Sequence, residues 1–203
     1  MQNREPTTAP GTTTGRANQK LRTRRAILQA AAELMRTGRE VTMLEVAKAA
    51  LVSEATAYRY FPDLASLLQE AMAGQMPTPA EALREVADSS DPVERVASAA
   101  EHLLRHVLAY QGATRAMIAA TVTRPATAAT RPGLRFGLID HALAPLDDTL
   151  ADADLAQLKN DLAVVVSAEA LFCLTDLCGL SPEDAIASAV HTATTLTRAA
   201  LRA

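Results

Sequence analysis

Apolar residues recur along most of this chain with the three- and four-residue spacing of an amphipathic helix. In the segment from about Gln19 to Arg36, one face carries Ile27, Ala30, Ala31 and Leu34. No sustained alternation of apolar and polar residues indicates a β-strand. Alanine and leucine, which both favour helices, dominate the composition. The pattern therefore predicts an all-α fold.

Two short helices joined by a tight turn are predicted between residues 42 and 61. Thr42 and Glu45 form a capping box at the start of the first helix. Ser53 is a favourable N-cap for the second helix, and Pro62 ends it because the residue before a proline is pushed out of helical geometry. A helix, a short turn and a second helix form a shape that fits the major groove of DNA. The pattern therefore predicts a helix-turn-helix.

The side chains of this segment are suited to DNA. Hydroxyl groups and guanidinium groups reach phosphate oxygens, and rings can contact thymine methyl groups. Basic residues near the start of the preceding helix oppose its dipole, which favours a role in contacting the DNA backbone. The predicted DNA-binding residues are Lys20, Arg22, Arg24, Thr42, Ser53, Thr56, Tyr58, Arg59 and Tyr60.

This part of the chain resembles the TetR/AcrR family of bacterial transcriptional regulators. The matching motifs are Ala47 to Val52, Val52-Ser53, Thr56-x-Tyr58-x-Tyr60-Phe61 and Leu67-Leu68, and they cover roughly residues 20 to 70. The resemblance implies that Thr42, Ser53, Thr56, Tyr58 and Tyr60 face DNA, and that Ala47, Val52, Phe61 and Leu68 are core. It also implies a regulator, more often a repressor, that a small molecule releases from DNA.

Three residues depart from what DNA binding by this family would favour. Leu51 stands where the family usually has a glycine in the turn, and Leu64 stands where it usually has a phosphate-binding lysine. Glu54 at the start of the second helix suits the helix dipole but not DNA. An alternative interpretation is therefore an interaction module of helix-turn-helix shape with weak or lost DNA binding.

Charge is unevenly distributed along the 203 residues, whose net charge is −3. From Arg16 to Leu68 there are nine Lys and Arg against five Asp and Glu, and from Gln69 to Ala203 there are ten against seventeen. A basic end on an acidic body is typical of a DNA-binding part joined to a part that does not bind DNA. No signal peptide and no membrane-spanning apolar run are visible, so a soluble cytoplasmic protein is expected.

The chain is expected to have three parts. Residues 1–17 are predicted to be a disordered tail, residues 18–68 the DNA-binding domain, and residues 69–203 a helical effector-binding and dimerisation domain. Within the last part, residues Thr123 to Gly133 are predicted to form a mobile loop. Helical pockets are mostly apolar with a few polar groups. The candidate ligand-binding residues are Tyr110, Met117, Phe136, Glu169, Phe172 and Asp176.

Two long helices are predicted to close the chain, from about Ala153 to Cys178 and from Ser181 onward. The first is apolar nearly all round at its centre, and such a helix needs cover on every side. We expect the last two helices of each subunit to pair in a homodimer. A homodimer would read an inverted repeat in double-stranded DNA.

Other residues whose side chains could bind a metal ion or react do not form a predicted site. His102 and His106 lie one turn apart, but the helical projection places them beside Arg95 and Arg105, opposite the apolar stripe. Solvated or pocket-edge histidines are therefore expected, and no metal site is predicted. The two cysteines, Cys173 and Cys178, are expected to be reduced, buried and unable to pair. Without a phosphate-binding loop or a nucleophile motif, neither an enzyme nor a cofactor is predicted.

Overall fold

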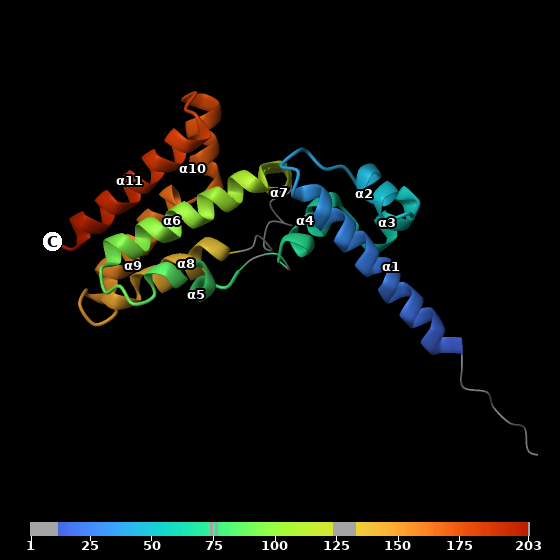
Figure 1. The fold of residues 1–203 in the computed structure, drawn as a ribbon, viewed down its shortest axis with the longest axis horizontal. Helices are drawn as coiled ribbons and strands as arrows, with labels where there is room; N and C mark the ends of the chain where they lie inside the picture. Colours follow the sequence, from blue (N-terminus) through green and yellow to red (C-terminus); the bar gives the residue numbers. More distant parts are fainter. Residues whose placement is uncertain (1–11, 74, 76, 124–132, 203) are drawn as a thin grey trace, which may run out of the picture.

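The computed structural model describes residues 12–73, 75, 77–123 and 133–202, and these residues form helices and connecting turns without a β-strand. The all-α prediction is therefore confirmed. Figure 1 shows two lobes that follow one another along the long axis of the molecule. We call the lobe that contains the first four helices the head and the rest of the chain the body.

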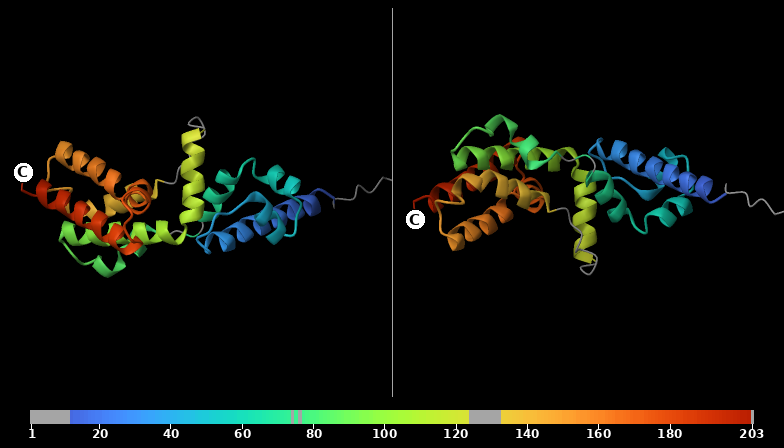
Figure 2. Two further views of the ribbon diagram at one scale, coloured as in Figure 1. Left: turned by 90° about the horizontal axis from the view of Figure 1, so that it is seen from above. Right: turned by 90° about the horizontal axis from the view of Figure 1, so that it is seen from below.

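The head begins with a long helix that carries the shorter ones. Its helices are α1 (Thr12–Met35), α2 (Met43–Ala49), α3 (Glu54–Tyr60) and α4 (Leu64–Ala73). The body starts with short elements and continues with longer helices. Its elements are α5 (Pro79–Ala82), η1 (Arg84–Val86), α6 (Pro92–Ala109), α7 (Gln111–Thr123), α8 (Leu134–Leu143), η3 (Ala144–Leu146), α9 (Asp152–Val165), α10 (Ala168–Phe172), η4 (Cys173–Leu177) and α11 (Pro182–Ala200). In both views of Figure 2, α7 stands crosswise between the two lobes.

Local capping interactions set the helix starts of the head. Thr42 Oγ1 accepts a hydrogen bond from the Glu45 amide at 3.2 Å, and the Glu45 carboxylate accepts one from the Thr42 amide at 2.9 Å. Ser53 Oγ accepts from the Thr56 amide at 3.2 Å, and Asp63 Oδ1 accepts from the Ser66 amide at 2.8 Å. These bonds satisfy amides that a helix start leaves without a partner. The predicted caps of α2 and α3 are therefore confirmed.

Leu51 makes the turn between α2 and α3 in a conformation that suits glycine. Its φ is +56°, in the left-handed region, and its side chain is 93% exposed. A residue with a Cβ is strained in this region because Cβ approaches the following carbonyl oxygen. The turn therefore forms without the glycine that the family pattern favours, and it stores strain.

Replacing Leu51 with glycine is expected to stabilise the head. Relief of left-handed strain, about 1–2 kcal/mol, exceeds the extra entropy that glycine loses on folding, about 0.5–1 kcal/mol. The exposed leucine side chain makes no packing contribution that would be lost. Urea unfolding monitored by circular dichroism would measure the gain, with Leu51→Ala as the control that keeps the strained Cβ. Equal stabilities of the two variants would contradict a strained turn.

The head is held together by one apolar core that extends past the predicted domain boundary. This core contains Ile27, Ala31, Met35, Val46, Ala57, Phe61, Leu67, Leu68, Ala71, Met72 and Ala113, among others. A boundary after Leu68 would cut through α4, because Ala71 and Met72 continue the same buried face one turn later. The core also includes Ala113 of α7, so α7 packs on the head as well as joining the body.

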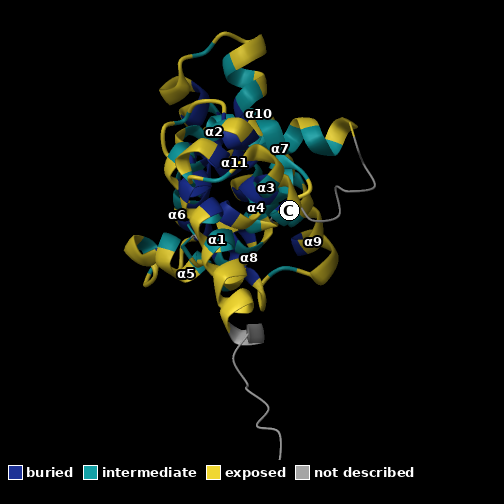
Figure 3. Cartoon of the chain, turned by 90° about the vertical axis from the view of Figure 1, so that its right-hand side faces the viewer, coloured by how far each residue is buried: buried dark blue, intermediate teal, exposed yellow. Residues whose placement is uncertain are grey.

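The start of α1 differs from the prediction. Residues 12–17 are helical, whereas they were expected to belong to a disordered tail. Once a helix has formed, each further residue adds one hydrogen bond, and no proline lies between Gly11 and the predicted start at Gln19. Residues 1–11 and residues 124–132 of the predicted mobile loop lie outside the described residues. Residues 15–22 of α1 are exposed, and Figure 3 shows this part of the helix away from the buried interior.

The core of the body surrounds α6, which packs against α11 and α8. Arg95 lies in this core and is only 5% exposed, although the helical projection had placed it on the solvent face. Its Nε donates to the Ala142 carbonyl at 3.1 Å, and its Nη2 donates to the His141 carbonyl at 2.7 Å. Its Nη1 donates to the carbonyls of Val86, Ala87 and Ser89. The guanidinium therefore ties together the end of α8 and the segment after η1, where helix ends leave carbonyls without partners.

The prediction of one long helix from Ala153 to Cys178 is wrong, because the chain leaves helical geometry at Val166 and Ser167. Val166 has a ψ of +69° and Ser167 is extended. Ser167 Oγ accepts from the Ala170 amide at 3.0 Å and so caps α10. A serine that can bond to the backbone competes with helix continuation, and the valines before it favour the helix less than alanine does.

Both cysteines are exposed, so the prediction of buried thiols is also wrong. Cys173 begins the π-helical turn η4, and Cys178 follows that turn. Figure 1 shows the connection from α10 to α11 at the outer edge of the body. The two thiols are exposed there, whereas Leu174 and Leu180 of the same connection pack against the core of the body.

Candidate functional site

Basic side chains from two helices gather on the outer face of the head. Arg16, Gln19 and Lys20 of α1 border a shallow hollow together with Arg59 and Tyr60 of α3. The Arg59 guanidinium lies 5.8 Å from the centre of the Tyr60 ring. None of the three cations forms an ion pair with a described residue. Their charge is therefore available to an anionic partner such as a phosphate backbone.

The hydroxyl groups predicted to face DNA lie along the same head. Thr42, Ser53 and Tyr58 are exposed, and Thr56 is half-buried. Ser53 Oγ and Thr56 Oγ1 lie 2.8 Å apart, so these hydroxyls share one hydrogen bond at the start of α3. The Tyr58 side chain is 47% exposed, and it projects from the helix that a groove would receive.

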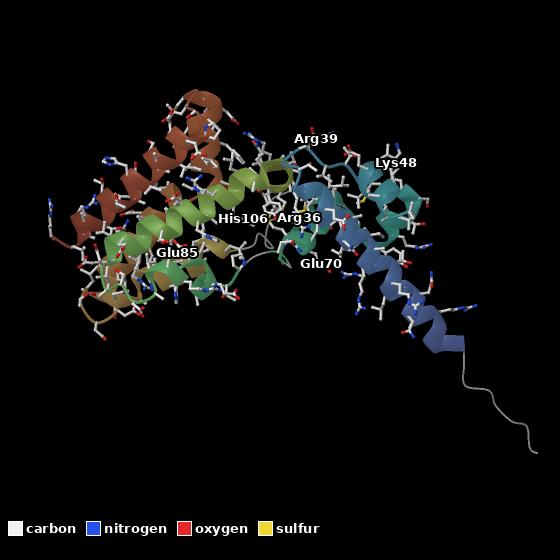
Figure 4. The ribbon with its side chains drawn as sticks, in the orientation of Figure 1. Arg36, Arg39, Lys48, Glu70, Glu85 and His106 are labelled. Atoms are coloured by element: carbon white, nitrogen blue, oxygen red, sulfur yellow. The ribbon has the colours of Figure 1, made fainter. Side chains whose placement is uncertain are left out.

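Arg24 has a structural partner within the head. Its guanidinium forms a paired hydrogen bond with the carboxylate of Glu70 on α4 and lies 4.9 Å from the centre of the Phe61 ring. The hydrogen bond to Glu70 raises the pKa of Arg24. Figure 4 shows Glu70 on α4 beside α1. The structure therefore separates Arg24 from Lys20 and Arg22, which are exposed, and gives it the role of joining α1 to α4.

A mostly apolar cavity of about 150 Å³ lies in the body where it meets the head. Its walls come from α4, α6, α7, α8 and α10 and from the turn before α10. The residues that line it are Met72, Leu103, His106, Val107, Thr114, Met117, Ile118, Gly133, Leu134, Arg135, Phe136, Ser167, Ala168 and Glu169. Concave, mostly apolar cavities with a few polar groups are typical of small-molecule sites.

Three of the six predicted ligand-binding residues line this cavity, namely Met117, Phe136 and Glu169. The other three do not. The Tyr110 ring packs against the His106 ring with centres 4.6 Å apart. Phe172 and Asp176 contact the guanidinium of Arg115 instead.

Arg115 of α7 connects that helix to α10 and η4. Its guanidinium lies 3.8 Å from the centre of the Phe172 ring, and its Nη2 donates to Asp176 Oδ1 at 2.8 Å. The hydrogen bond from Arg115 is the main cause that lowers the pKa of Asp176 to about 2. Asp176 and Phe172 therefore hold α7 in place. An ion pair between residues 61 positions apart has no local sequence signal.

The two histidines of α6 are not on a solvated face, but His106 lines the cavity, in agreement with the pocket-edge alternative. Both are half-buried, and each has an Nε2 atom that is buried without a hydrogen-bond partner among the described residues. Burial, and in smaller part the neighbouring His102, lowers the pKa of His106. The helical projection assumed one core face, but α6 is also covered by α7 and α10. Figure 4 shows His106 near the end of α6 that faces the head.

The head and body meet in a close backbone contact. A Cβ placed on Gly112, in the first turn of α7, would lie 2.0 Å from the Arg39 carbonyl oxygen. Gly38 has a φ of +68°, and its own Cβ position lies 3.5 Å from the Ala109 carbonyl oxygen. Arg36 also donates to Gln75 Oε1 at 2.7 Å. The loop between α1 and α2 is therefore seated directly on the turn between α6 and α7.

Comparisons with known proteins agree with this architecture. The family model described as bacterial regulatory proteins, tetR family, matches residues 27–71, which lie within the head. A solved TetR transcriptional regulator from Rhodococcus sp. RHA1 is similar in fold, with 24% sequence identity and a TM-score of 0.54. The similarity covers 87% of this chain and 97% of that chain. No curated protein matches the sequence.

These findings identify the kind of domain that the head contains. No helix in the described part of the chain has the length and apolar character needed to cross a membrane. The helix-turn-helix of the head, formed by α2 and α3, lies within the segment that the family model matches. Residues 27–71 of the head therefore match the DNA-binding domain of bacterial regulatory proteins of the tetR family, and this match supports a DNA-binding transcriptional regulator.

Proposed function

We propose that this regulator is a repressor that binds an inverted-repeat operator as a homodimer and that a small molecule in the body cavity releases it. It would act in the cytoplasm, where its DNA lies. The observation that carries the ligand response is the position of Met72. This residue of α4 belongs to the buried core of the head and also lines the cavity.

A ligand in the cavity would therefore touch a helix of the DNA-binding head directly. A ligand shifts a conformational equilibrium only by its differential affinity for the two states. Met72 can give the ligand a different affinity for the two states, because a change in its packing alters both the shape of the cavity and the position of α4. A movement of α4 would change how α3 is presented to the groove.

The dimer would form through α11 and the segment from α9 to η4 of each subunit. One face of α11 packs on α6 and α9, and the other face is exposed. Two large apolar side chains in the preceding segment are also exposed, Val164 at 72% and Leu177 at 83%. Exposed apolar residues on paired helices favour a partner surface. Two heads related by a twofold axis would read two half-sites.

The DNA-binding role is tested by selecting bound fragments from genomic DNA with the purified protein. We expect an enriched inverted repeat, and we expect affinity for it to fall as salt rises because bound cations displace counterions. Arg59→Ala and Lys20→Ala should each reduce the slope of log affinity against log salt by about one. Tyr58→Ala should weaken binding to the repeat with a smaller effect on the slope.

Arg84→Ala is the matched control, because Arg84 is an exposed cation on the body. It should leave both affinity and slope unchanged. Failure to enrich any sequence at low salt would contradict the operator and would favour an interaction module. An enriched sequence without twofold symmetry would contradict the homodimer.

A further inference from the structure

The hydroxyl groups in the described wall of the body cavity form their hydrogen bonds within the protein. Thr114 Oγ1 donates to the Tyr110 carbonyl at 3.1 Å. Ser167 Oγ donates to the Val164 carbonyl at 2.8 Å and accepts from the Ala170 amide at 3.0 Å. A hydroxyl group has one hydrogen to donate, so neither residue has a free donor for a bound molecule.

The charged and titratable side chains of the described wall offer no free charge. Arg135 Nη1 and Glu169 Oε2 form an ion pair at 3.4 Å, so each charge is balanced by the other. The Nε2 atom of His106 is buried, and burial lowers the pKa of this imidazole, so its neutral form is favoured near pH 7. A charged group that entered the cavity would lose its hydration without gaining a free counter-charge, which is unfavourable.

Most of the wall is apolar, and part of it can adapt its shape. Leu103 and Val107 of α6 are buried side chains that line the cavity. Met72 of α4 and Met117 of α7 add flexible thioether side chains, which can pack against apolar molecules of different shapes. An apolar molecule gives up no hydrogen bond to water when it enters such a space, and its surface is removed from water.

The volume of the cavity limits the size of its occupant. An apolar cavity of about 150 Å³ accommodates one benzene ring. Phe136 of α8 lines the cavity and is 52% exposed, so a molecule that contacts its ring removes further apolar surface from water. The wall therefore favours one apolar ring or a short apolar chain.

We propose that the cavity binds a wholly apolar molecule of about the size of one aromatic ring, namely a small aromatic or aliphatic hydrocarbon, in preference to a molecule with a hydroxyl or charged group. The basis is that the hydroxyl groups and charges of the wall are already paired within the protein. This inference rests on the proposed role of the cavity as the effector site, and it names the chemical class of the effector.

The test compares benzene, phenol and benzoate on the full chain without DNA, with ¹³C-labelled methionine methyl groups as reporters. Benzene is expected to bind about tenfold more tightly than phenol, because the phenol hydroxyl loses water without regaining a hydrogen bond. Benzoate is expected to bind more weakly than phenol, because its charge is not balanced. Benzene should shift the methyl resonances of Met72 and Met117, and it should leave that of Met43, in the core of the head, unchanged.

Two variants of the wall test where and why the molecule binds. Ala168→Leu adds a larger side chain to the wall and should weaken benzene binding at least about tenfold, because it occupies space that the ring needs. Ala170→Leu is the matched control, because Ala170 is also half-buried on α10 but does not line the cavity. Met117→Gln places an amide of similar length in the wall and should reduce the preference for benzene over phenol.

Phenol affinity equal to or above that of benzene, tightest binding of benzoate, or no binding of benzene would each overturn the proposal. Full benzene affinity in folded Ala168→Leu would overturn it as well. Operator release is measured separately, with the DNA repeat that the fragment selection enriches. If benzene binds as expected but leaves the protein on DNA, the proposed regulation fails while the ligand class stands.

Discussion

Replacing Arg95 with methionine is expected to lower the free energy of unfolding by about 3–5 kcal/mol, the largest loss that we predict for a single side chain. Methionine fills much of the same space but donates no hydrogen bond. The carbonyls of Val86, His141 and Ala142 would then lie in or beside the core with fewer partners. For a chain of this size the midpoint of thermal unfolding should fall by roughly 10 °C.

The matched control for Arg95 is Arg84→Met, an identical change at an exposed position on η1. It should alter stability by less than about 0.5 kcal/mol. Arg95→Lys should recover only part of the loss, because one ammonium group cannot reproduce the planar fork that reaches both α8 and the segment after η1. Similar midpoints for Arg95→Met and Arg84→Met would show that the buried guanidinium does not stabilise the body.

Replacing Gly112 with alanine is expected to destabilise the protein by about 3 kcal/mol, because the new methyl group has no room. It would lie 2.0 Å from the Arg39 carbonyl oxygen and 2.8 Å from the Glu40 amide nitrogen. Both are backbone atoms, so the loop between α1 and α2 must move away from α7. Hydrogen exchange should report this as faster exchange of amides in that loop and in the first turn of α7.

Gly137→Ala provides the same chemical change inside α8. Its Cβ would meet a side-chain atom of Pro79 at 3.4 Å, an ordinary contact. Alanine favours a helix more than glycine does, so this variant should be more stable by about 0.5–1 kcal/mol. A Gly112→Ala protein with unchanged stability and unchanged hydrogen exchange would contradict a close backbone contact between the head and the body.

Several features of the head were predictable from residues near one another in the chain. A cap joins a side chain to an amide a few positions away, so the caps at Thr42, Ser53 and Asp63 could be predicted from the local sequence. The absence of a glycine in the turn at Leu51 was also visible in the sequence, whereas its left-handed φ of +56° was found in the structure. Because these features depend on residues that are close together in the chain, they can also be recognised as family motifs in this segment.

The body and the candidate sites depended on contacts between distant residues. Periodicity indicates one apolar face of a helix, but α6 is covered from more than one side, so the burial of Arg95 and His106 could not be read from it. The ion pair between Arg24 and Glu70 could not be predicted from the sequence, because the fold brings these two distant residues together. Phe172 and Asp176 looked like pocket residues until Arg115 reached them from α7.

By itself the sequence determined the all-α class, the helix starts and the helix-turn-helix, because each depends on hydrogen bonds and side-chain spacings within one or two turns. Only the tertiary structure decided which charges are paired, which histidine faces a cavity, and that Met72 joins this cavity to the head. Those properties depend on how several helices pack around one another, and the burial and pairing of a side chain follow from all the helices that cover it.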